Sequence, residues 1–242
     1  MKNYLKDLID HTQSLEVDLI KVSGTDTETE ITAITQEKSV IISGLFKNVI
    51  SDFIGVFGMP NINKLKTIVG FDEYDETANI YVTTTQRDGV DCPGAIHFET
   101  KTGDFINDYR LMFKSVVEEK IGKPSFKGAT WNVEFEPSVA GIMRLKKQSQ
   151  ANSEEKHFVA KVINGDLTFY FGDPSTHSGN FVFQSQVQGS LNKAWYWPVK
   201  EFNNIMDLVG DKIIRIADAG AIEIVVDSGL ATYRYLIPAQ VK

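Results

Sequence analysis

The sequence is poor in cysteine and histidine. Among its 242 residues there is one cysteine, Cys92, and there are four widely separated histidines, His11, His97, His157 and His177. A single cysteine excludes an intramolecular disulfide framework and a zinc site built from several cysteines, and it is typical of a reducing compartment. The histidines lack the spacing of metal ligands. We therefore expect neither a metal nor a cofactor.

Long apolar runs are missing as well. The most apolar stretch, residues 53–63, is too short to span a bilayer and contains glycine and proline. The N-terminal residues MKNYLKDLIDH carry a charge every few positions, so no signal peptide is apparent. The fractions of hydrophobic (42%) and charged (24%) residues are ordinary for a globular protein. These features favour a cytoplasmic protein with no membrane contact.

Catalytic signatures are also absent from the sequence. No GxGxxG, GxxxxGK[ST], HExxH or GxSxG pattern occurs. The tripeptide His97-Phe98-Glu99 resembles the HxE of zinc deaminases, but the PCxxC partner motif requires two cysteines. We therefore expect that the protein is not an enzyme. If it is one, Asp91, His97 and Glu99 are the best candidates for its site.

What the sequence does contain is an internal repeat. Residues 60–70 (PNINKLKTIVG) and 200–210 (KEFNNIMDLVG) align on their Val-Gly ends, which places Asn63 on Asn203. Each segment is a short helical pattern with apolar residues at i, i+3 and i+4, followed by glycine as a stop signal. These apolar positions are Leu65, Ile68 and Val69 in the first copy and Ile205, Leu208 and Val209 in the second. A fainter repeat with the same spacing matches Leu5, Leu8 and Ile9 with Val139, Ile142 and Met143.

Most of the remaining sequence predicts short strands that are rich in β-branched and aromatic residues. Turn signals such as Asn164-Gly165 and Ser228-Gly229 separate them. The best linker candidate is 117–132, which contains Pro124, two glycines and five charges. We therefore predict two repeated domains, 1–116 and 133–242, joined by the linker 117–132. The segment 85–116 fits the repeat least well.

The net charge is −7, yet basic residues gather on the predicted helices. The windows between Asp52 and Asp72 and between Glu136 and Glu154 contain no acid. Their basic residues are Lys64, Lys66, Arg144, Lys146 and Lys147. A basic helix face on an acidic protein favours local contact with phosphates, although most lysines on a polar helix face are merely solvated.

The combination of two α/β repeats, antiparallel strands, basic helices and no catalytic site resembles the sliding clamps, the processivity factors of DNA polymerases. The sequence is similar in character to the two-domain clamps of T4-like bacteriophages. The resemblance is found in FIGVFGMPNINKLKTIVGFDEYDETANIYV (53–82), WNVEFEPSVAGIMRLKKQSQ (131–150) and ATYRYLIPAQ (231–240). It implies the DNA clamp fold, an α+β architecture in which each of two repeated domains has two antiparallel sheets and two inner helices.

The resemblance also implies a role in DNA replication. A viral protein of this kind would form a homotrimeric ring around double-stranded DNA in the cytoplasm of an infected bacterial host. It would hold DNA without reading its sequence and tether the replicative polymerase, with a clamp loader as a further partner. The implied DNA contacts are Lys6, Lys64, Lys66, Arg144, Lys146, Lys147 and Lys200. The implied surface for polymerase and loader comprises Phe126, Trp131, Leu236, Ile237 and Pro238.

An alternative function is that of an acidic, β-rich structural protein of a phage virion, such as a tail or baseplate subunit. Such a protein would lack catalytic residues too, but nothing would place its basic residues on paired helices. The oligomeric state, together with retention on closed circular DNA, distinguishes a clamp from this alternative and from an enzyme.

Overall fold

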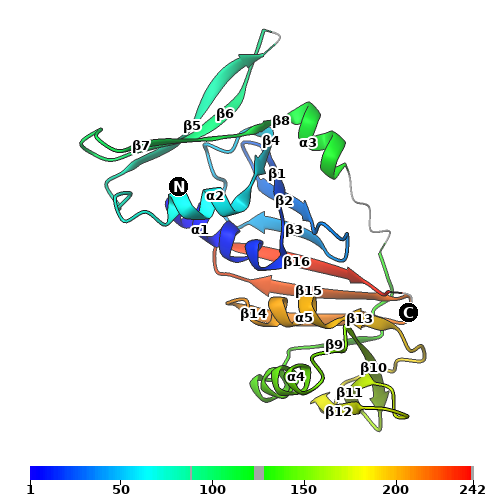
Figure 1. The fold of residues 1–242 in the computed structure, drawn as a ribbon. Coiled ribbons are helices and arrows are strands. Elements are labelled where there is room, and N and C mark those ends of the chain that lie inside the picture. The colour runs from blue at the N-terminus through cyan, green and yellow to red at the C-terminus, as the bar shows by residue number, and fades with distance from the viewer. Residues whose placement is uncertain (88, 123–127, 241–242) are drawn as a thin grey trace. The chain divides into compact units, whose positions relative to one another are not determined.

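The computed structural model describes residues 1–87, 89–122 and 128–240. The chain divides into two compact units (Figure 1). Unit 1 comprises Met1–Ser125 and Ser228–Tyr233, and unit 2 comprises Phe126–Asp227 and Arg234–Lys242. In both units antiparallel sheets pack with a few helices, which confirms the predicted α+β class.

The main sheet of unit 1 follows helix α1 (Lys2–Asp10) and the short 3-10 helix η1 (Gln13–Leu15). In spatial order its strands are β8 (Met112–Phe113), β4 (Gly55–Pro60), β1 (Leu19–Gly24), β2 (Thr29–Ile34) and β3 (Ile41–Phe46). Helix α2 (Ile62–Val69) follows β4, and helix α3 (Lys114–Ile121) follows β8. Helices α1 and α2 lie on one side of this sheet and α3 lies on the other (Figure 1).

The alternation of side chains along β1 explains how both faces of this sheet are covered. Ile20 and Val22 are fully buried, whereas Leu19 and Lys21 point to the opposite face. On that face the Lys21 ammonium donates to the carbonyl of Gly122, at the end of α3, over 3.2 Å. A two-residue period therefore supplies one apolar face for α1 and α2 and a second surface for α3.

The segment that the sequence analysis left unplaced, 85–116, forms most of a second sheet in unit 1. Its strands, in spatial order, are β5 (Asn79–Arg87), β6 (Val90–Glu99) and β7 (Ile106–Arg110). Tyr74 is fully buried beneath this sheet, with its ring centroid 5.4 Å from the rings of both Phe98 and Phe105. The sequence missed α3 because its apolar positions are few; Val117 and Ile121 are the buried residues of that helix.

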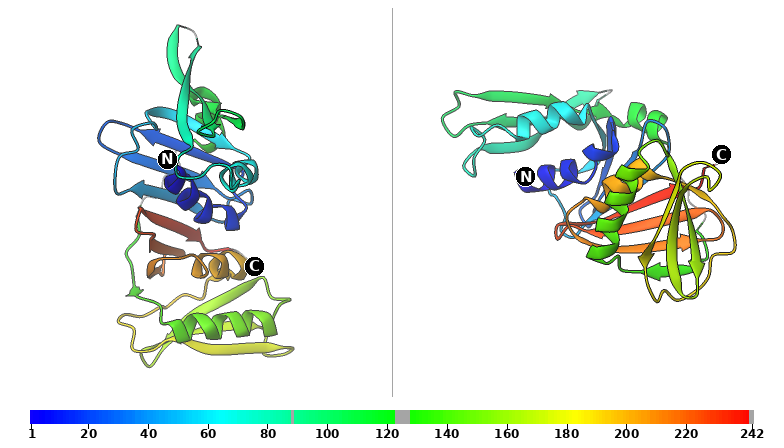
Figure 2. Two further views of the ribbon diagram at one scale, coloured as in Figure 1. Left: turned by 90° about the vertical axis from the view of Figure 1, so that its left-hand side faces the viewer. Right: turned by 60° about the horizontal axis from the view of Figure 1, so that its bottom comes forward.

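Unit 2 contains two further antiparallel sheets. In spatial order one consists of β16 (Ala231–Pro238, of which Arg234–Pro238 belongs to unit 2), β15 (Ala221–Asp227), β14 (Asp211–Ala217) and β9 (Val133–Phe135). The other consists of β12 (Ser178–Gln184), β11 (Asp166–Gly172), β10 (His157–Ile163) and β13 (Tyr196–Pro198). Helix α4 (Val139–Ala151) lies over the strands of this other sheet (Figure 2), and helix α5 (Val199–Met206) follows β13.

The core of unit 2 is an aromatic cluster. Phe169 stacks on Phe183 with ring centroids 4.5 Å apart and lies 4.4 Å from Phe158. Phe202 of α5 meets Phe158 edge-on at 5.1 Å. These four side chains are at most 1% exposed. Each such pair adds about 0.5–1.5 kcal/mol beyond the burial of its area, so the cluster fixes α5 against the sheet.

The predicted repeat of α2 and α5 exists, but its register was wrong by three residues. Each helix has eight residues, and the buried positions match when Ile62 is placed on Val199. The buried residues are Ile62, Leu65, Ile68 and Val69 in α2 and Val199, Phe202, Ile205 and Met206 in α5. Val209, expected in the apolar stripe, lies beyond the helix and is 82% exposed.

The cause of this error is the glycine used for the alignment. Gly70 directly ends α2 with a right-handed backbone. Gly210 is no stop signal for α5, which ends four residues earlier. It has φ 121°, and a Cβ there would lie 2.2 Å from the carbonyl oxygen of Asp227. It is glycine because of this close approach.

The predicted apolar stripe of α4 was also wrong. Val139 is 75% exposed and Met143 is 55% exposed. The buried helix residues are Gly141 and Leu145 instead. A Cβ at Gly141 would lie 2.2 Å from the carbonyl oxygen of Phe183, so the helix backbone approaches β12 at this residue. The close approach at glycine, rather than the larger apolar side chains, decides which face packs.

Candidate nucleic-acid interface and partner surface

The basic face of unit 1 is built on α2. Lys64 and Lys66 are exposed on either side of Leu65, which is fully buried. The Lys66 ammonium donates to Oε1 of Gln13 over 2.7 Å, and Nε2 of Gln13 donates to Oδ1 of Asn63 over 3.1 Å. Gln13 therefore links η1 to α2 and fixes one of the two ammonium groups. Within the described ranges, the Lys64 side chain has no hydrogen bond or ion pair.

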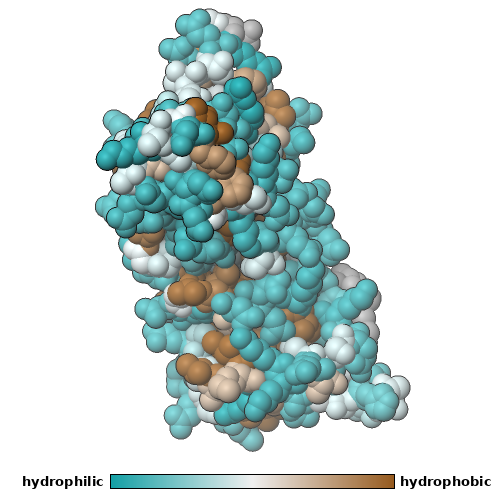
Figure 3. Space-filling view, turned by 60° about the vertical axis from the view of Figure 1, so that its left-hand side comes forward, coloured by the Kyte–Doolittle hydropathy of each residue, from teal (hydrophilic) through white to brown (hydrophobic). Residues whose placement is uncertain are grey.

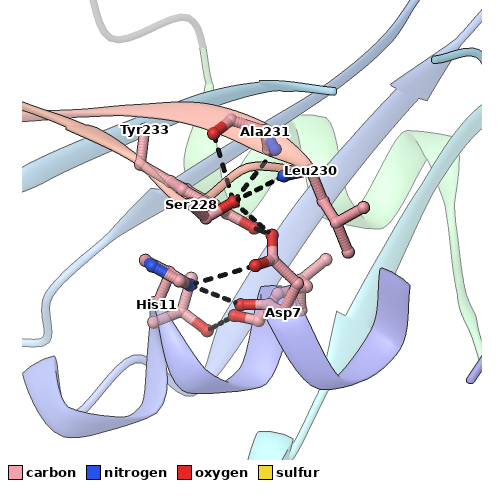
Figure 4. A network of polar contacts seen from close by, with 8 residues as sticks. Asp7, His11, Ser228, Leu230, Ala231 and Tyr233 are labelled. Atoms are coloured by element: carbon pink, nitrogen blue, oxygen red, sulfur yellow. Dashed lines mark hydrogen bonds and ion pairs between the residues drawn. The ribbon is translucent and has the colours of Figure 1, made fainter. Parts of the chain in front are cut away.

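Lys6 of α1 is exposed, and the acid beside it is not its partner. The Asp7 carboxylate turns into unit 1 (Figure 4). Its Oδ2 accepts hydrogen bonds from Tyr233 Oη over 2.8 Å and from Ser228 Oγ over 3.0 Å. The sequence analysis did not anticipate that this acid is held in an internal network. The sequence places the Asp7 carboxylate beside Lys6, but in the structure this carboxylate is bonded to Tyr233 and Ser228 and does not offset the charge of Lys6 at the surface.

The same network fixes α1 to the end of the chain. His11, one turn after Asp7, stacks on the Tyr233 ring with centroids 4.5 Å apart and planes 1° apart. Its Nδ1 lies 2.8 Å from the carbonyl oxygen of Asp7 and 3.5 Å from the Asp7 carboxylate. His11 and Tyr233 are at most 4% exposed, so the network is structural and α1 is held rigidly.

The basic residues of unit 2 differ in how freely they can meet a ligand. Arg144 donates from Nη1 to the carbonyl of Val182 over 2.7 Å, and Lys146 forms an ion pair with Asp207. Lys147 is exposed, and its side chain has no hydrogen bond or ion pair among residues 128–240 or elsewhere in the described chain. Lys200 is exposed at the start of α5. Lys147 is therefore the most available cation of α4.

An asparagine links two helices in each unit. In unit 2, Nδ2 of Asn203 on α5 donates to Oγ of Ser149 on α4 over 2.9 Å. In unit 1, Asn63 of α2 accepts from Gln13. In the corrected register Asn63 matches Lys200 rather than Asn203, so the two links are not a repeated feature.

Lys212 is a further cation that the sequence analysis missed. Its ammonium donates to the carbonyl of Gly210 over 3.0 Å and to that of Leu208, just beyond α5. Burial lowers the pKa of Lys212, while the charges of Asp207 and Asp211 raise it in part. This lysine binds backbone carbonyls and is not available for a ligand.

The predicted partner residues are only partly at the surface. Phe126 lies outside the described residues. Trp131 and Leu236 are half-buried, Pro238 is exposed, and Ile237 is fully buried. Ile237 can therefore shape the surface from below but offers a partner no contact area.

The turn between β14 and β15 organises this surface and brings in residues that the sequence analysis missed. Asp218 accepts hydrogen bonds from the backbone N–H of Asn192 over 2.8 Å and of Lys193 over 3.3 Å. Burial alone would raise the pKa of Asp218, but these hydrogen bonds outweigh it and hold the pKa below its usual value. The Asp218 carbonyl accepts the Trp195 indole N–H over 2.9 Å. Trp195 is thereby fixed beside the chain end.

The C-terminal residues are held against the same turn. The Ala239 N–H donates to the Gly220 carbonyl and the Gln240 N–H donates to the Tyr196 carbonyl, each over 2.9 Å. Asn132, next to Trp131, accepts the Asp218 N–H over 2.8 Å. Trp131, Trp195 and the chain end thus border one turn, which we call the Asp218 surface. The feature of the sequence that could have identified Trp195 is a tryptophan in a stretch that predicts a loop.

The alternative catalytic site does not assemble. His97 Nδ1 lies 2.8 Å from Asp108, and Nε2 lies 3.7 Å from Glu99. Asp91 lies six residues away on the same strand, about 20 Å along it. Among the described residues no three His, Cys, Asp or Glu side chains come together as a metal site, and no helix is long and apolar enough to cross a membrane.

Exposed apolar side chains are scattered rather than gathered. Figure 3 shows small apolar groups on a mainly hydrophilic face. The larger exposed apolar residues include Val139, Met143 and Val209 near the predicted DNA contacts, and Tyr81, Val90 and Ile106 in the sheet of β5, β6 and β7. Isolated apolar residues are normal on a soluble surface.

Comparison with known proteins identifies the fold. No family model matches the chain, and no curated protein matches it. A solved structure of the C-terminal region of FEN-1 bound to A. fulgidus PCNA is similar with a TM-score of 0.69 and 10% identity, over 100% of this chain and 96% of that chain. PCNA from Thermococcus kodakaraensis is similar with a TM-score of 0.64 and 11% identity, over 99% and 97%. The chain therefore has the two-domain fold of the PCNA-type sliding clamps.

Proposed function

We propose that this protein is a sliding clamp of DNA replication that encircles duplex DNA and tethers a polymerase. The observation that supports this most strongly is the similarity of fold over the whole length of both chains. The helix pairs α1–α2 and α4–α5 would face the DNA, with Lys6, Lys64 and Lys147 as the most available contacts. Lys66, Arg144, Lys146 and Lys200 would contribute less, because the first three of these are bonded within the protein.

Contacts of this kind suit a ring that slides. Phosphates are the same in every sequence, so lysines hold DNA without selecting a site. Because few ammonium groups are available, the total attraction to DNA stays weak. The net charge of −7 discourages DNA binding elsewhere on the surface.

The ring would be a head-to-tail homotrimer, with six similar units in three chains. The described sheets end in strands with one unpaired edge, among them β7 in unit 1 and β12 in unit 2. Unlike edges of two copies can pair, which covers them and produces a heterologous contact that closes into a ring.

The decisive experiment combines mass and DNA topology. Light scattering should give three times the chain mass of 27.1 kDa. The trimer should be retained on nicked circular DNA after loading and lost when the DNA is linearised. A monomer or dimer that shows no dependence on DNA ends contradicts the clamp and favours a structural virion protein.

A matched pair of variants tests the DNA face. Lys64→Ala with Lys147→Ala should weaken retention and flatten its salt dependence by about one unit per lost phosphate contact. Lys101→Ala with Lys161→Ala removes two exposed charges outside these helices and should change neither. If both pairs of variants show the same DNA retention and the same salt dependence, α2 and α4 do not form the DNA face.

We further propose that polymerase and clamp loader dock at the Asp218 surface of a phage clamp. Trp131, Trp195, Leu236 and Pro238 offer apolar area there, and the solved PCNA complex shows that a clamp of this fold binds the C-terminal region of another protein. Trp195→Ala should reduce stimulation of the cognate polymerase while the trimer remains. Full stimulation by this variant contradicts the assignment.

A further inference from the structure

One edge of the sheet formed by β5, β6 and β7 has no neighbouring strand within the described residues. The middle strand, β6, pairs with β5 on one side and with β7 on the other, so the outer edge of β5 is open. The proposed ring would use β7, at the opposite edge. Beyond the end of β7, β5 and β6 continue as a two-stranded ribbon (Figure 1). β5 therefore exposes a row of backbone N–H and C=O groups that the proposed clamp function does not use.

Unit 2 shows what lies at this position in the other half of the repeat. β5 follows helix α2 and β14 follows helix α5, so the two strands correspond. The outer edge of β14 is covered by β9, which is antiparallel to it. Val133 and Phe135 of β9 lie opposite Ile216 and Ile214 of β14. In residues 1–87 and 89–122 of unit 1, no strand takes the place of β9 beside β5.

The burial of two apolar residues on each strand reflects this difference. On β14, Ile214 and Ile216 are 0% and 1% exposed. Ile80 and Val82 have the same position on β5, since all four residues lie opposite fully buried residues of the next strand. Ile80 and Val82 are nevertheless partly exposed. A strand added beside β5 would cover them, and removing this apolar surface from water would favour its binding.

The sequence of β5 does not prevent such pairing. Exposed strand edges are normally protected by charges, by proline or by a bulge. Residues 79–85 (NIYVTTT) contain neither a charge nor a proline, and apart from Asn79 they are all β-branched or aromatic. The register shift between Thr83 and Thr84 places its extra residue on β6, at Gly94. Residues 79–83 therefore form a regular and unprotected strand edge.

An acidic loop directly precedes this edge. Its exposed acids are Asp72, Glu73, Asp75 and Glu76. Hydrogen bonds from Thr77, and to a lesser extent the charge of Lys101, lower the pKa of Asp75. The side chains of the other three acids have no hydrogen bond or ion pair with any described residue. The Lys2 ammonium reaches the loop but donates to the Tyr74 carbonyl. Four carboxylates thus outnumber two ammonium groups, and the loop attracts cations.

Tyr74 fixes this loop in place. Its side chain is fully buried, and its hydroxyl accepts a hydrogen bond from the Asn107 amide over 2.7 Å. The acids on either side of Tyr74 are therefore held next to the start of β5. A partner would not have to order the loop on binding.

We propose that the outer edge of β5 binds an extended segment of a partner protein, in which two apolar residues at alternate positions are followed by lysines or arginines. The segment would add an antiparallel fourth strand to the sheet, as β9 does in unit 2. Its apolar side chains would lie beside Val82 and Ile80. Because the added strand is antiparallel, its C-terminal end would lie beside the start of β5, where the acidic loop would bind the basic residues. The whole site belongs to unit 1, so it does not require the ring.

Hydrogen–deuterium exchange of the full chain, measured by mass spectrometry, locates the bound segment. The probe is an acetylated, amidated peptide of sequence TVTFTKK, in which Val-Thr-Phe follows the apolar spacing of β9. It should slow the exchange of backbone amides in residues 79–83. A matched peptide with glutamates in place of the lysines should bind about three- to tenfold more weakly, since each exposed ion pair contributes little. Added salt should reduce this difference.

N-methylation of the peptide distinguishes strand addition from other modes of binding. In an antiparallel pair, alternate residues of the added strand direct their N–H groups towards β5. One peptide is N-methylated at its valine and phenylalanine, and the other at its second and third threonines. One of the two should lose about tenfold or more in affinity, because its hydrogen bonds to β5 are blocked, and the other should bind as the unmodified peptide does.

Variants of the chain test the charge preference. Asp72→Asn with Glu76→Gln should reduce the preference for lysines over glutamates, whereas Asp26→Asn with Glu28→Gln, at exposed acids of the turn between β1 and β2, should not. Unchanged exchange in residues 79–83, equal affinities of the two N-methylated peptides, or protection of β7 instead would overturn the proposal. Protection of β5 by a second copy of the chain without peptide would also overturn it. Retention on circular DNA should be unchanged in the variant of the acidic loop, so failure of this proposal is distinguishable from failure of the clamp function.

Discussion

Replacing Gly141 by alanine should destabilise the protein, although the same change usually stabilises a helix. In a helix interior, glycine to alanine gains about 1 kcal/mol. At Gly141 the added Cβ would lie 2.2 Å from the carbonyl oxygen of Phe183 and 3.2 Å from its carbon. Both atoms belong to the backbone of β12, so the helix itself must move by about 1 Å to restore a normal contact. Overpacking usually costs about 1–3 kcal/mol, and a clash with backbone places this substitution at the upper end, about 2–3 kcal/mol.

The net effect follows from these two terms. We expect a loss of about 1–2 kcal/mol in the free energy of unfolding, which lowers Tm by about 2–8 °C in a domain of this size. A shift of α4 would also stretch the hydrogen bond from Arg144 to the Val182 carbonyl, now 2.7 Å. Because the same shift displaces Lys147, retention on DNA should weaken if α4 contributes to the DNA face.

Urea unfolding followed by circular dichroism measures this effect. Ala140→Gly, at the neighbouring exposed position of α4, is the matched control and should cost about 1 kcal/mol through propensity alone. If Gly141→Ala raises Tm, α4 does not approach β12 closely, and the explanation given for its buried face is refuted.

Three further outcomes are expected. Asp7→Ala removes the carboxylate that accepts from the Tyr233 and Ser228 hydroxyls, so it should cost about 2 kcal/mol in urea unfolding, whereas exposed Asp10→Ala should cost less than about 0.5 kcal/mol. Equal costs would show that the network is not stabilising. Gln13→Ala releases the Lys66 ammonium, so it should alter the salt dependence of DNA retention without changing Tm by more than about 2 °C. If the salt dependence is unchanged, Gln13 does not position Lys66 for DNA. The pKa of Asp218 is lowered on folding, so its contribution to stability is present above the unfolded pKa of 3.8 and is lost as pH falls through the folded pKa. The free energy of unfolding measured between pH 2 and 5 should therefore depend less on pH in Asp218→Asn than in the unmodified protein. Identical pH profiles would contradict this linkage.

The sequence predicted what depends on local pattern. Helix α2 was placed correctly because its apolar positions Leu65, Ile68 and Val69 repeat at helical spacing and Gly70 ends it. Short strands such as β1 and β15 were predicted from their β-branched residues and turns. The α+β class followed from the order of these elements and the clamp fold from the resemblance to sliding clamps, and the structure bears both out. The domain limits and the contact residues remain predictions.

Tertiary structure decided the features that depend on residues far apart in the chain. The exposed side of α4 is set by the approach of Gly141 to Phe183, and Asp7 is withdrawn from the surface by Ser228 and Tyr233. Neither partner is visible from the helix itself. Local spacing fixes which residues lie on one side of an element, but the closest approach between backbones fixes which side is buried.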